Sequence, residues 1–217
     1  KHCEDTIFTG YSNGYKTNRD AWAYNFSREA ECRNMSGMLD EYARQVLVGK
    51  IEYIPEKIKW NRSLEGYAVK RTSIPYDDSK AIVSNYRPFT KLWFYNEYRT
   101  IDMSYQMPRI YPDGAENLTI CVAGVGVKKD FSCLMTNTHT DLEIVGKSQC
   151  FPLYWYETDP ERSSQQRSLT DFGGKAQSNG LVRHDGISDW ALQQARSKYG
   201  DAVTREDIFY YIYGYLH

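Results

Sequence analysis

The sequence predicts an α+β fold, in which a central β-rich region lies between an N-terminal helix and a C-terminal helical hairpin. Three observations lead to this prediction. Apolar residues recur at helical spacing near the two ends of the chain. Between the ends, apolar and polar residues alternate in short segments, as in half-buried strands. The chain has 217 residues, 41% of them hydrophobic, which is enough to bury a core.

The chain divides into four parts. Residues 1–50 hold a turn-rich segment and a spacer helix, and residues 51–157 form the β-rich region. Residues 158–183 are polar and low in apolar side chains, so a surface loop or a disordered linker is expected there. Residues 184–217 form the helical hairpin.

The N-terminal helix is expected from Ser27 to Val48. Ser27 is a typical N-cap, acidic residues follow in the first turns, and Gly49 is a plausible stop. Met and Tyr side chains recur on one face, which we expect to be buried.

The β-rich region is expected to contain six to eight strands. Alternation predicts half-buried strands between Ile51 and Pro75. IVSNYRPFTKLWFYN predicts a strand, a turn and a second strand, with Leu92 and Phe94 on one face. Pro112-Asp113-Gly114 predicts a turn. Four more segments are predicted strands: LTICVAGVGV, FSCLMT, DLEIV and CFPLYWYE.

Two short amphipathic segments predict the C-terminal hairpin. The first runs from Ser188 to Tyr199 and stops at Gly200. The second begins after Thr204, which forms a capping-box pattern with Asp207. The aromatic-rich faces of this hairpin must pack on the β-rich region or on a neighbouring domain.

Composition limits the classes of function and the location. The net charge of −1 argues against bulk, non-specific binding of nucleic acid. Even so, the segment from Arg44 to Arg109 holds twelve Lys or Arg against seven Asp or Glu, which is compatible with a DNA-facing surface or with a solvated charged face. No apolar run is long enough to cross a bilayer, and no signal peptide opens the chain. Five scattered cysteines without a CxxC pair favour a reducing cytoplasm, so the four N-x-[ST] sequons are attributed to chance.

Catalytic signatures are absent or incomplete. The glycines of GVGVKKDFS match neither a phosphate loop nor a dinucleotide fingerprint, and favour a turn between strands. His139 lies near Asp141, but no nucleophile motif accompanies the pair. Asp113 and Glu116 could supply carboxylates to a metal-dependent nuclease, in an arrangement that is loose for this purpose. No metal site is predicted, because the four histidines are dispersed.

Recognition chemistry concentrates between Asn85 and Pro112, where basic and amide side chains alternate with aromatic ones. Arginine can bind guanine through two hydrogen bonds, and Asn or Gln can bind adenine in the same way. Candidates for phosphate contact are Lys16, Asn18, Arg19, Lys91, Arg99, Lys128 and Lys129. Candidates for base contact are Arg87, Asn96, Gln106 and Arg109.

Each group has a structural alternative. The residues around Asn18 can instead form local turns, with Trp22, Tyr24 and Phe26 alternating inward. Arg87 can instead make a buried ion pair, and the aromatics of this stretch are expected to be mainly core.

Six segments in order resemble the C-terminal region of type ISP restriction-modification enzymes and related predicted helicases. The resemblance covers nearly the whole chain. The segments are SNGYKTNRDAWAYNFS, YRPFTKLWFYN, MPRIYP, FSCLMTNTHTDLE, QCFPLYWYE and ISDWALQQARSKYGDAVTREDIFYYIYGYLH.

The resemblance implies a target recognition domain for double-stranded DNA, without catalytic residues of its own. In such enzymes this domain follows a nuclease, a helicase-like ATPase, a coupler and an adenine methyltransferase. S-adenosylmethionine, ATP and magnesium would then belong to those other parts, and no cofactor is expected in this chain. The methyltransferase domain of the same polypeptide is the expected protein partner. Two alternatives remain, a coupling domain that docks the methyltransferase without reading bases, and the nuclease.

Overall fold

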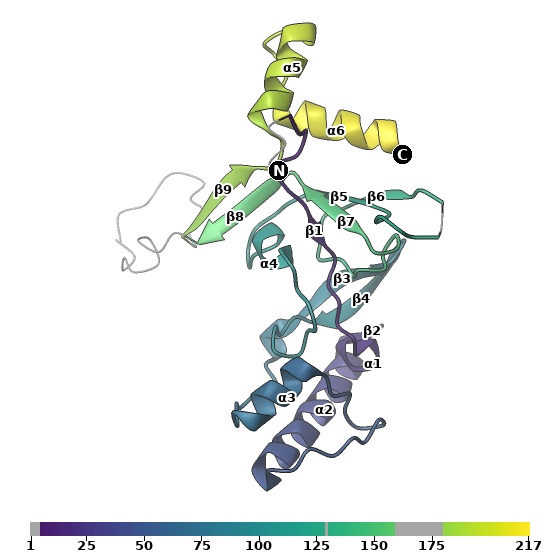
Figure 1. The fold of residues 1–217 in the computed structure, drawn as a ribbon, viewed down its shortest axis with the longest axis vertical. Helices are drawn as coiled ribbons and strands as arrows, with labels where there is room; N and C mark the ends of the chain where they lie inside the picture. The colour runs from purple at the N-terminus through teal and green to yellow at the C-terminus, as the bar shows by residue number, and fades with distance from the viewer. Residues whose placement is uncertain (1–4, 129, 159–179) are drawn as a thin grey trace.

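In the computed structural model, helices occupy the two ends of an elongated molecule and antiparallel sheets lie between them (Figure 1). The structure describes residues 5–128, 130–158 and 180–217. The predicted α+β class is confirmed. None of the helices in the described ranges is long and apolar enough to cross a membrane.

Three sheets make up the centre. The four-stranded sheet has the order β1 (Ser12–Asn13), β7 (Gln149–Pro152), β5 (Thr119–Val122) and β6 (Cys133–Thr136). The three-stranded sheet has the order β2 (Tyr24–Asn25), β4 (Thr90–Tyr95) and β3 (Ala81–Arg87). The third sheet pairs β8 (Tyr154–Thr158) with β9 (Leu181–Asp185).

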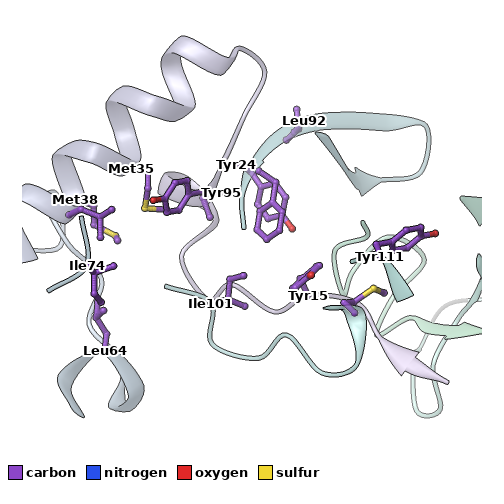
Figure 2. Packing of buried hydrophobic residues seen from close by; sticks show 14 of the residues in the cluster. Tyr15, Tyr24, Met35, Met38, Leu64, Ile74, Leu92, Tyr95, Ile101 and Tyr111 are labelled. Atoms are coloured by element: carbon purple, nitrogen blue, oxygen red, sulfur yellow. The ribbon is translucent and has the colours of Figure 1, made fainter. Parts of the chain in front are cut away.

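The long helix α2 (Arg28–Val48) confirms the predicted N-terminal helix. The Ser27 hydroxyl accepts a hydrogen bond from the Ala30 amide, and Gly49 ends the helix in the left-handed conformation with φ of 74°. Its Met35, Met38 and Tyr42 side chains are buried. They lie in the main core, which also contains Tyr24 and Tyr95 and continues to Tyr111 (Figure 2).

Six strands, β3 to β8, begin in the predicted β-rich region, in agreement with the expected number for the described part of it. The strand–turn–strand unit is confirmed as β3 and β4, and Leu92 and Phe94 point into the core. The turn at Pro112-Asp113-Gly114 is also present, with φ of 79° at Gly114. Short helices not predicted from the sequence are α1 (Asp20–Ala23), α4 (Met107–Ile110) and the 3-10 turn η1 (Asp78–Lys80).

Other strand predictions were wrong. No strand lies between Ile51 and Pro75; the segment holds helix α3 (Arg62–Val69), which is capped by the Asn61 side chain. DLEIV forms turns, because its Asp141 carboxylate accepts from the Glu143 amide instead of extending the chain. CFPLYWYE is divided at Leu153 between two sheets.

Two predictions fall at the edge of the described residues or beyond it. Most of the predicted polar loop, residues 159–179, lies outside the described residues. Its expected end at residue 183 was wrong, because Leu181–Asp185 pairs with β8.

The inward alternation of aromatics was wrong at Phe26, which is 82% exposed.

The C-terminal hairpin is confirmed as α5 (Asp189–Tyr199) and α6 (Arg205–Leu216). Phe209 of α6 is fully buried in a second core with Ile120, Leu153 and Ile187. One face of the hairpin therefore packs on the four-stranded sheet. Tyr199, Tyr211 and Tyr215 of the hairpin are exposed.

Candidate nucleic-acid interface

Arg19 is a structural residue and cannot serve as the predicted phosphate contact in this conformation. Its side chain is 1% exposed. Its guanidinium donates to the carbonyl of Thr100 and, at 3.2 Å, to that of Lys59. Burial lowers the pKa of Arg19 to about 10, although the nearby charge of Asp102 opposes the shift. The side chain thus ties three segments together inside the fold.

Arg87 lies at the turn end of the β3–β4 hairpin and has partners within the fold. Its Nη1 atom donates to Asp141 Oδ1 at 2.7 Å and to the carbonyl of Tyr86 at 2.6 Å. The guanidinium carbon lies 3.8 Å from the centre of the Tyr86 ring. Burial raises the pKa of Asp141 to about 6, while its contacts with the Glu143 amide and Arg87 lower it. This is the ion pair that the sequence left open as an alternative to base contact.

Three other predicted residues have partners within the chain. Lys16 Nζ lies 2.8 Å from Asp102 Oδ2, at a half-exposed position. Arg99 Nε lies 2.7 Å from Glu97 Oε1, and its Nη1 donates to the Ser73 carbonyl. Asn96 is half-buried; its backbone amide donates to the carbonyl of Lys80, and its side chain interacts with the Tyr15 hydroxyl. These contacts occupy the groups that were assigned to DNA.

Lys91 and Lys128 remain exposed, and with Lys147 they carry no ion pair or side-chain hydrogen bond among the described residues. Lys91 is on β4, Lys128 follows the turn after β5, and Lys147 precedes β7. Lys129 lies outside the described residues. Asn18 is exposed, with φ of 58°.

Hydrogen bonds connect the turns that carry these three lysines. The Asn85 amide of β3 donates to the carbonyl of His139, and the Asp141 amide donates to the carbonyl of Asn85. The Gly124 amide donates to the carbonyl of Gly146 at 3.0 Å. A side chain at Gly124 would meet the Lys147 carbonyl oxygen at 2.0 Å, so this close approach requires glycine. We call residues 87–91, 123–128 and 137–148 the linked turns.

A separate pocket of about 380 Å³ brings Gln106 and Arg109 together. Trp155, Glu157 and His184 of the β8–β9 hairpin line its other side. Arg109 forms an ion pair with Glu157, and its guanidinium carbon lies 5.5 Å from the Trp155 ring centre. Gln106 Oε1 accepts from Arg109 at 3.4 Å. The sequence predicted the first two side chains, but not the wall supplied by a hairpin almost 50 residues away.

The histidine and carboxylate candidates do not form a catalytic group in the described part of the chain. His139 is packed between the rings of Tyr15 and Tyr111, and burial lowers its pKa to about 4. In the same ranges, no cluster of three His, Cys, Asp or Glu side chains could hold a metal ion.

Comparison with solved structures places this architecture in a class of DNA restriction-modification proteins. The cryo-EM structure of the DrdV–DNA complex matches with a TM-score of 0.82 and 29% identity, over 98% of this chain and 19% of DrdV. The ATP-dependent type ISP enzyme LlaBIII bound to DNA matches with a TM-score of 0.79 and 29% identity, over 100% of this chain and 14% of LlaBIII. A nuclease-deletion mutant of the type ISP enzyme LlaGI, in complex with a DNA substrate mimic, matches with a TM-score of 0.75 and 26% identity. This match covers 98% of this chain and 15% of the LlaGI chain.

Residues 6–217 match the family model of the type ISP C-terminal specificity domain, and the chain belongs to this family. The predicted resemblance is thereby confirmed. The chain spans less than a fifth of the length of each of these three structures. A comparison with curated protein sequences found no match.

Proposed function

We propose that this chain recognises a specific sequence in double-stranded DNA, as the non-catalytic target recognition part of a restriction-modification enzyme. The observation that carries the proposal is membership of the specificity-domain family over residues 6–217. The three similar structures are complexes with DNA or a DNA mimic, which supports the same partner here.

Phosphate contacts come from lysines that have no carboxylate partner among the described residues, chiefly Lys91 and Lys128. Their role is to fix the orientation of the domain on the duplex without reading sequence. Lys16, Asn18, Arg99 and Lys129 remain candidates of the same kind. Lys16 and Arg99 would first have to exchange their carboxylate partners for phosphate.

Base contacts come from Gln106 and Arg109, whose side chains meet at one pocket. Glu157 would have to release Arg109 before that side chain could donate two hydrogen bonds to a guanine. Arg87 and Asn96 are weaker candidates for base contact, because both side chains already have partners within the fold. A wrong base at a directly read position should cost about 1–3 kcal/mol of binding free energy.

The other parts of such an enzyme would supply the reaction. A methyltransferase domain in the same polypeptide is the proposed partner, and S-adenosylmethionine, ATP and magnesium would act there and in the motor and nuclease parts. This chain is proposed to need no cofactor for recognition, and to act in the cytoplasm, where DNA is accessible.

Selection from a random duplex pool tests the proposal. The chain is incubated with the pool at low and high salt, and retained duplexes are sequenced. We expect an enriched motif and retention that decreases with salt. Retention without a motif, or no retention, would contradict sequence recognition.

A coupling role without base reading is the second candidate, and one observation favours it. An apolar groove of about 590 Å³ lies between α5 and α6, lined by Trp190, Tyr199 and Tyr211 among others. Such a groove suits contact with a neighbouring domain. The selection experiment separates the candidates, since a coupling domain would enrich no motif.

A further inference from the structure

Phe89 is an apolar side chain held almost fully in solvent. It is 90% exposed, the largest exposed fraction of any aromatic residue in the described ranges. It occupies the turn between β3 and β4, directly after Pro88. Single exposed apolar side chains are common on protein surfaces, but this ring makes no contact with another aromatic ring among the described residues.

The backbone at Phe89 is also unusual. Its φ is 59°, in the left-handed region that glycine and asparagine adopt readily and bulky residues rarely do. A glycine here would relieve strain and remove exposed apolar surface. Phe89 therefore satisfies no requirement of the fold that is visible in the structure, and strained residues of this kind are often functional.

The hairpin beneath Phe89 is firmly anchored. Arg87 binds Asp141, and β3 and β4 are paired from Ala81 to Arg87 with one irregularity next to the turn. Pro88 fixes its own φ and restricts the turn further. The ring is therefore presented from a rigid support, which limits the entropy lost when it binds.

The linked turns that carry Phe89 also carry three exposed lysines. Lys91 follows two residues later, and Lys128 and Lys147 lie on the other linked turns. None of the three has an ion-pair partner among the described residues. An exposed apolar ring on a turn that is linked to turns carrying these lysines matches the chemistry of duplex DNA, where stacked bases lie between phosphate backbones.

We propose that Phe89 is a wedge that inserts between two adjacent base pairs of the bound duplex and unstacks them. The proposal rests on the proposed DNA-binding function and adds a residue and a deformation to it. Apolar side chains used in this way kink the duplex, and the cost depends on the base step. Phe89 would thus contribute to specificity without a hydrogen bond to any base.

The test uses the full chain and the duplex recovered by selection. Phe89→Gly relieves the backbone strain, so its thermal unfolding temperature should equal or exceed that of the wild type. Its affinity for the duplex should fall about tenfold, the range expected for loss of one stacked contact. Phe89→Trp should bind within about threefold of the wild type, because it keeps a ring that can stack.

Permanganate oxidation of thymines placed along the site reports unstacking directly. We expect one reactive step with the wild type, and no reactive step with Phe89→Gly. Phe26→Gly is the matched control, because Phe26 is 82% exposed and lies outside the linked turns; its affinity and permanganate pattern should match the wild type.

The outcomes separate this proposal from the one on which it rests. Wild-type affinity in Phe89→Gly would overturn the wedge and leave DNA recognition intact. In another outcome, Phe89→Gly loses affinity, deoxyuridine in place of thymine causes the same loss in the wild type, and no reactive step is seen. This outcome would assign Phe89 to contact with a thymine methyl group and would also overturn the wedge. Absence of any DNA binding by the wild type would overturn both proposals.

Discussion

At the scale of single residues, Glu31 shows how burial controls a charge. The side chain lies on α2 with no exposed surface, and its Oε1 atom has no hydrogen-bond partner in the described structure. The hydroxyl of Tyr76 lies 3.5 Å from Oε2. Burial raises the pKa of Glu31 to about 7, and the charge of Asp78 adds to the shift, whereas Tyr76 and Arg28 oppose it.

This pKa predicts a pH-dependent stability. In the unfolded chain the carboxyl titrates near its ordinary value of 4.5, so between about pH 4.5 and 7 the folded state binds more protons. The free energy of unfolding should therefore decrease, by on the order of 1–2 kcal/mol, as the pH rises from about 5 to 7.5. Asp141, whose pKa is raised to about 6, adds to the same slope.

Urea unfolding of Glu31→Gln across this range checks the prediction. The slope with pH should be smaller than in the wild type, because one titrating group has been removed. Glu29→Gln, an exposed acid of the same helix, is the control and should keep the wild-type slope. An unchanged slope in Glu31→Gln would assign the pH dependence elsewhere.

At the scale of elements, the start of α6 depends on a complete capping box. The Thr204 hydroxyl accepts from the Asp207 amide, and the Asp207 carboxylate accepts from the Thr204 amide at 2.9 Å. Hydrogen bonds from Thr204 lower the pKa of Asp207. The cap fixes the direction of α6, and thereby the placement of Phe209 in the second core.

Thr204→Ala should lower the free energy of unfolding by about 1 kcal/mol, because the Asp207 amide loses its acceptor and the Asp207 carboxylate loses the hydroxyl donor. Thr204→Ser keeps the hydroxyl and should lose only a few tenths of that. Thermal and urea unfolding measure both variants. Equal losses in Ala and Ser would show that the methyl group, and not the cap, is responsible.

Elements that are marked by local signals were predictable from the sequence. Caps and turns are local, so Ser27, Gly49, Thr204 and Gly114 identified their elements correctly. Helix α3 has only eight residues, and its Tyr67 and Val69 are typical of strands, so alternation was mistaken for a strand. Its Asn61 cap was the available signal for a helix.

Side-chain partners depend on distant segments and could not be predicted in this way. Arg19 is buried because Thr100 and Lys59 offer carbonyls from other parts of the fold. Arg87 meets Asp141 across 54 residues. Residue type identified candidates for DNA contact, but only the folded structure distinguishes occupied cations from free ones.

At the scale of the whole molecule, a near-neutral chain can still bind DNA if its free cations face one way. The net charge is −1, yet Lys91, Lys128 and Lys147 on the linked turns have no described partner. A lysine that neutralises a phosphate releases condensed counterions, and binding then weakens as salt increases. The salt dependence of binding therefore counts the lysines that contact phosphate.

We expect each of Lys91→Ala, Lys128→Ala and Lys147→Ala to reduce the slope of log affinity against log salt by about 1. Fluorescence anisotropy between about 50 and 200 mM salt measures the slope, which should fall similarly for matched and mismatched duplexes because phosphates carry no sequence. Lys198→Ala, on α5 at one end of the molecule, should leave it unchanged (Figure 1). Arg62 and Arg71, on and just after α3, have no ion-pair partner among the described residues and define the competing surface. If only their removal reduced the slope, DNA would bind at the α2–α3 end and the linked turns would face away from it.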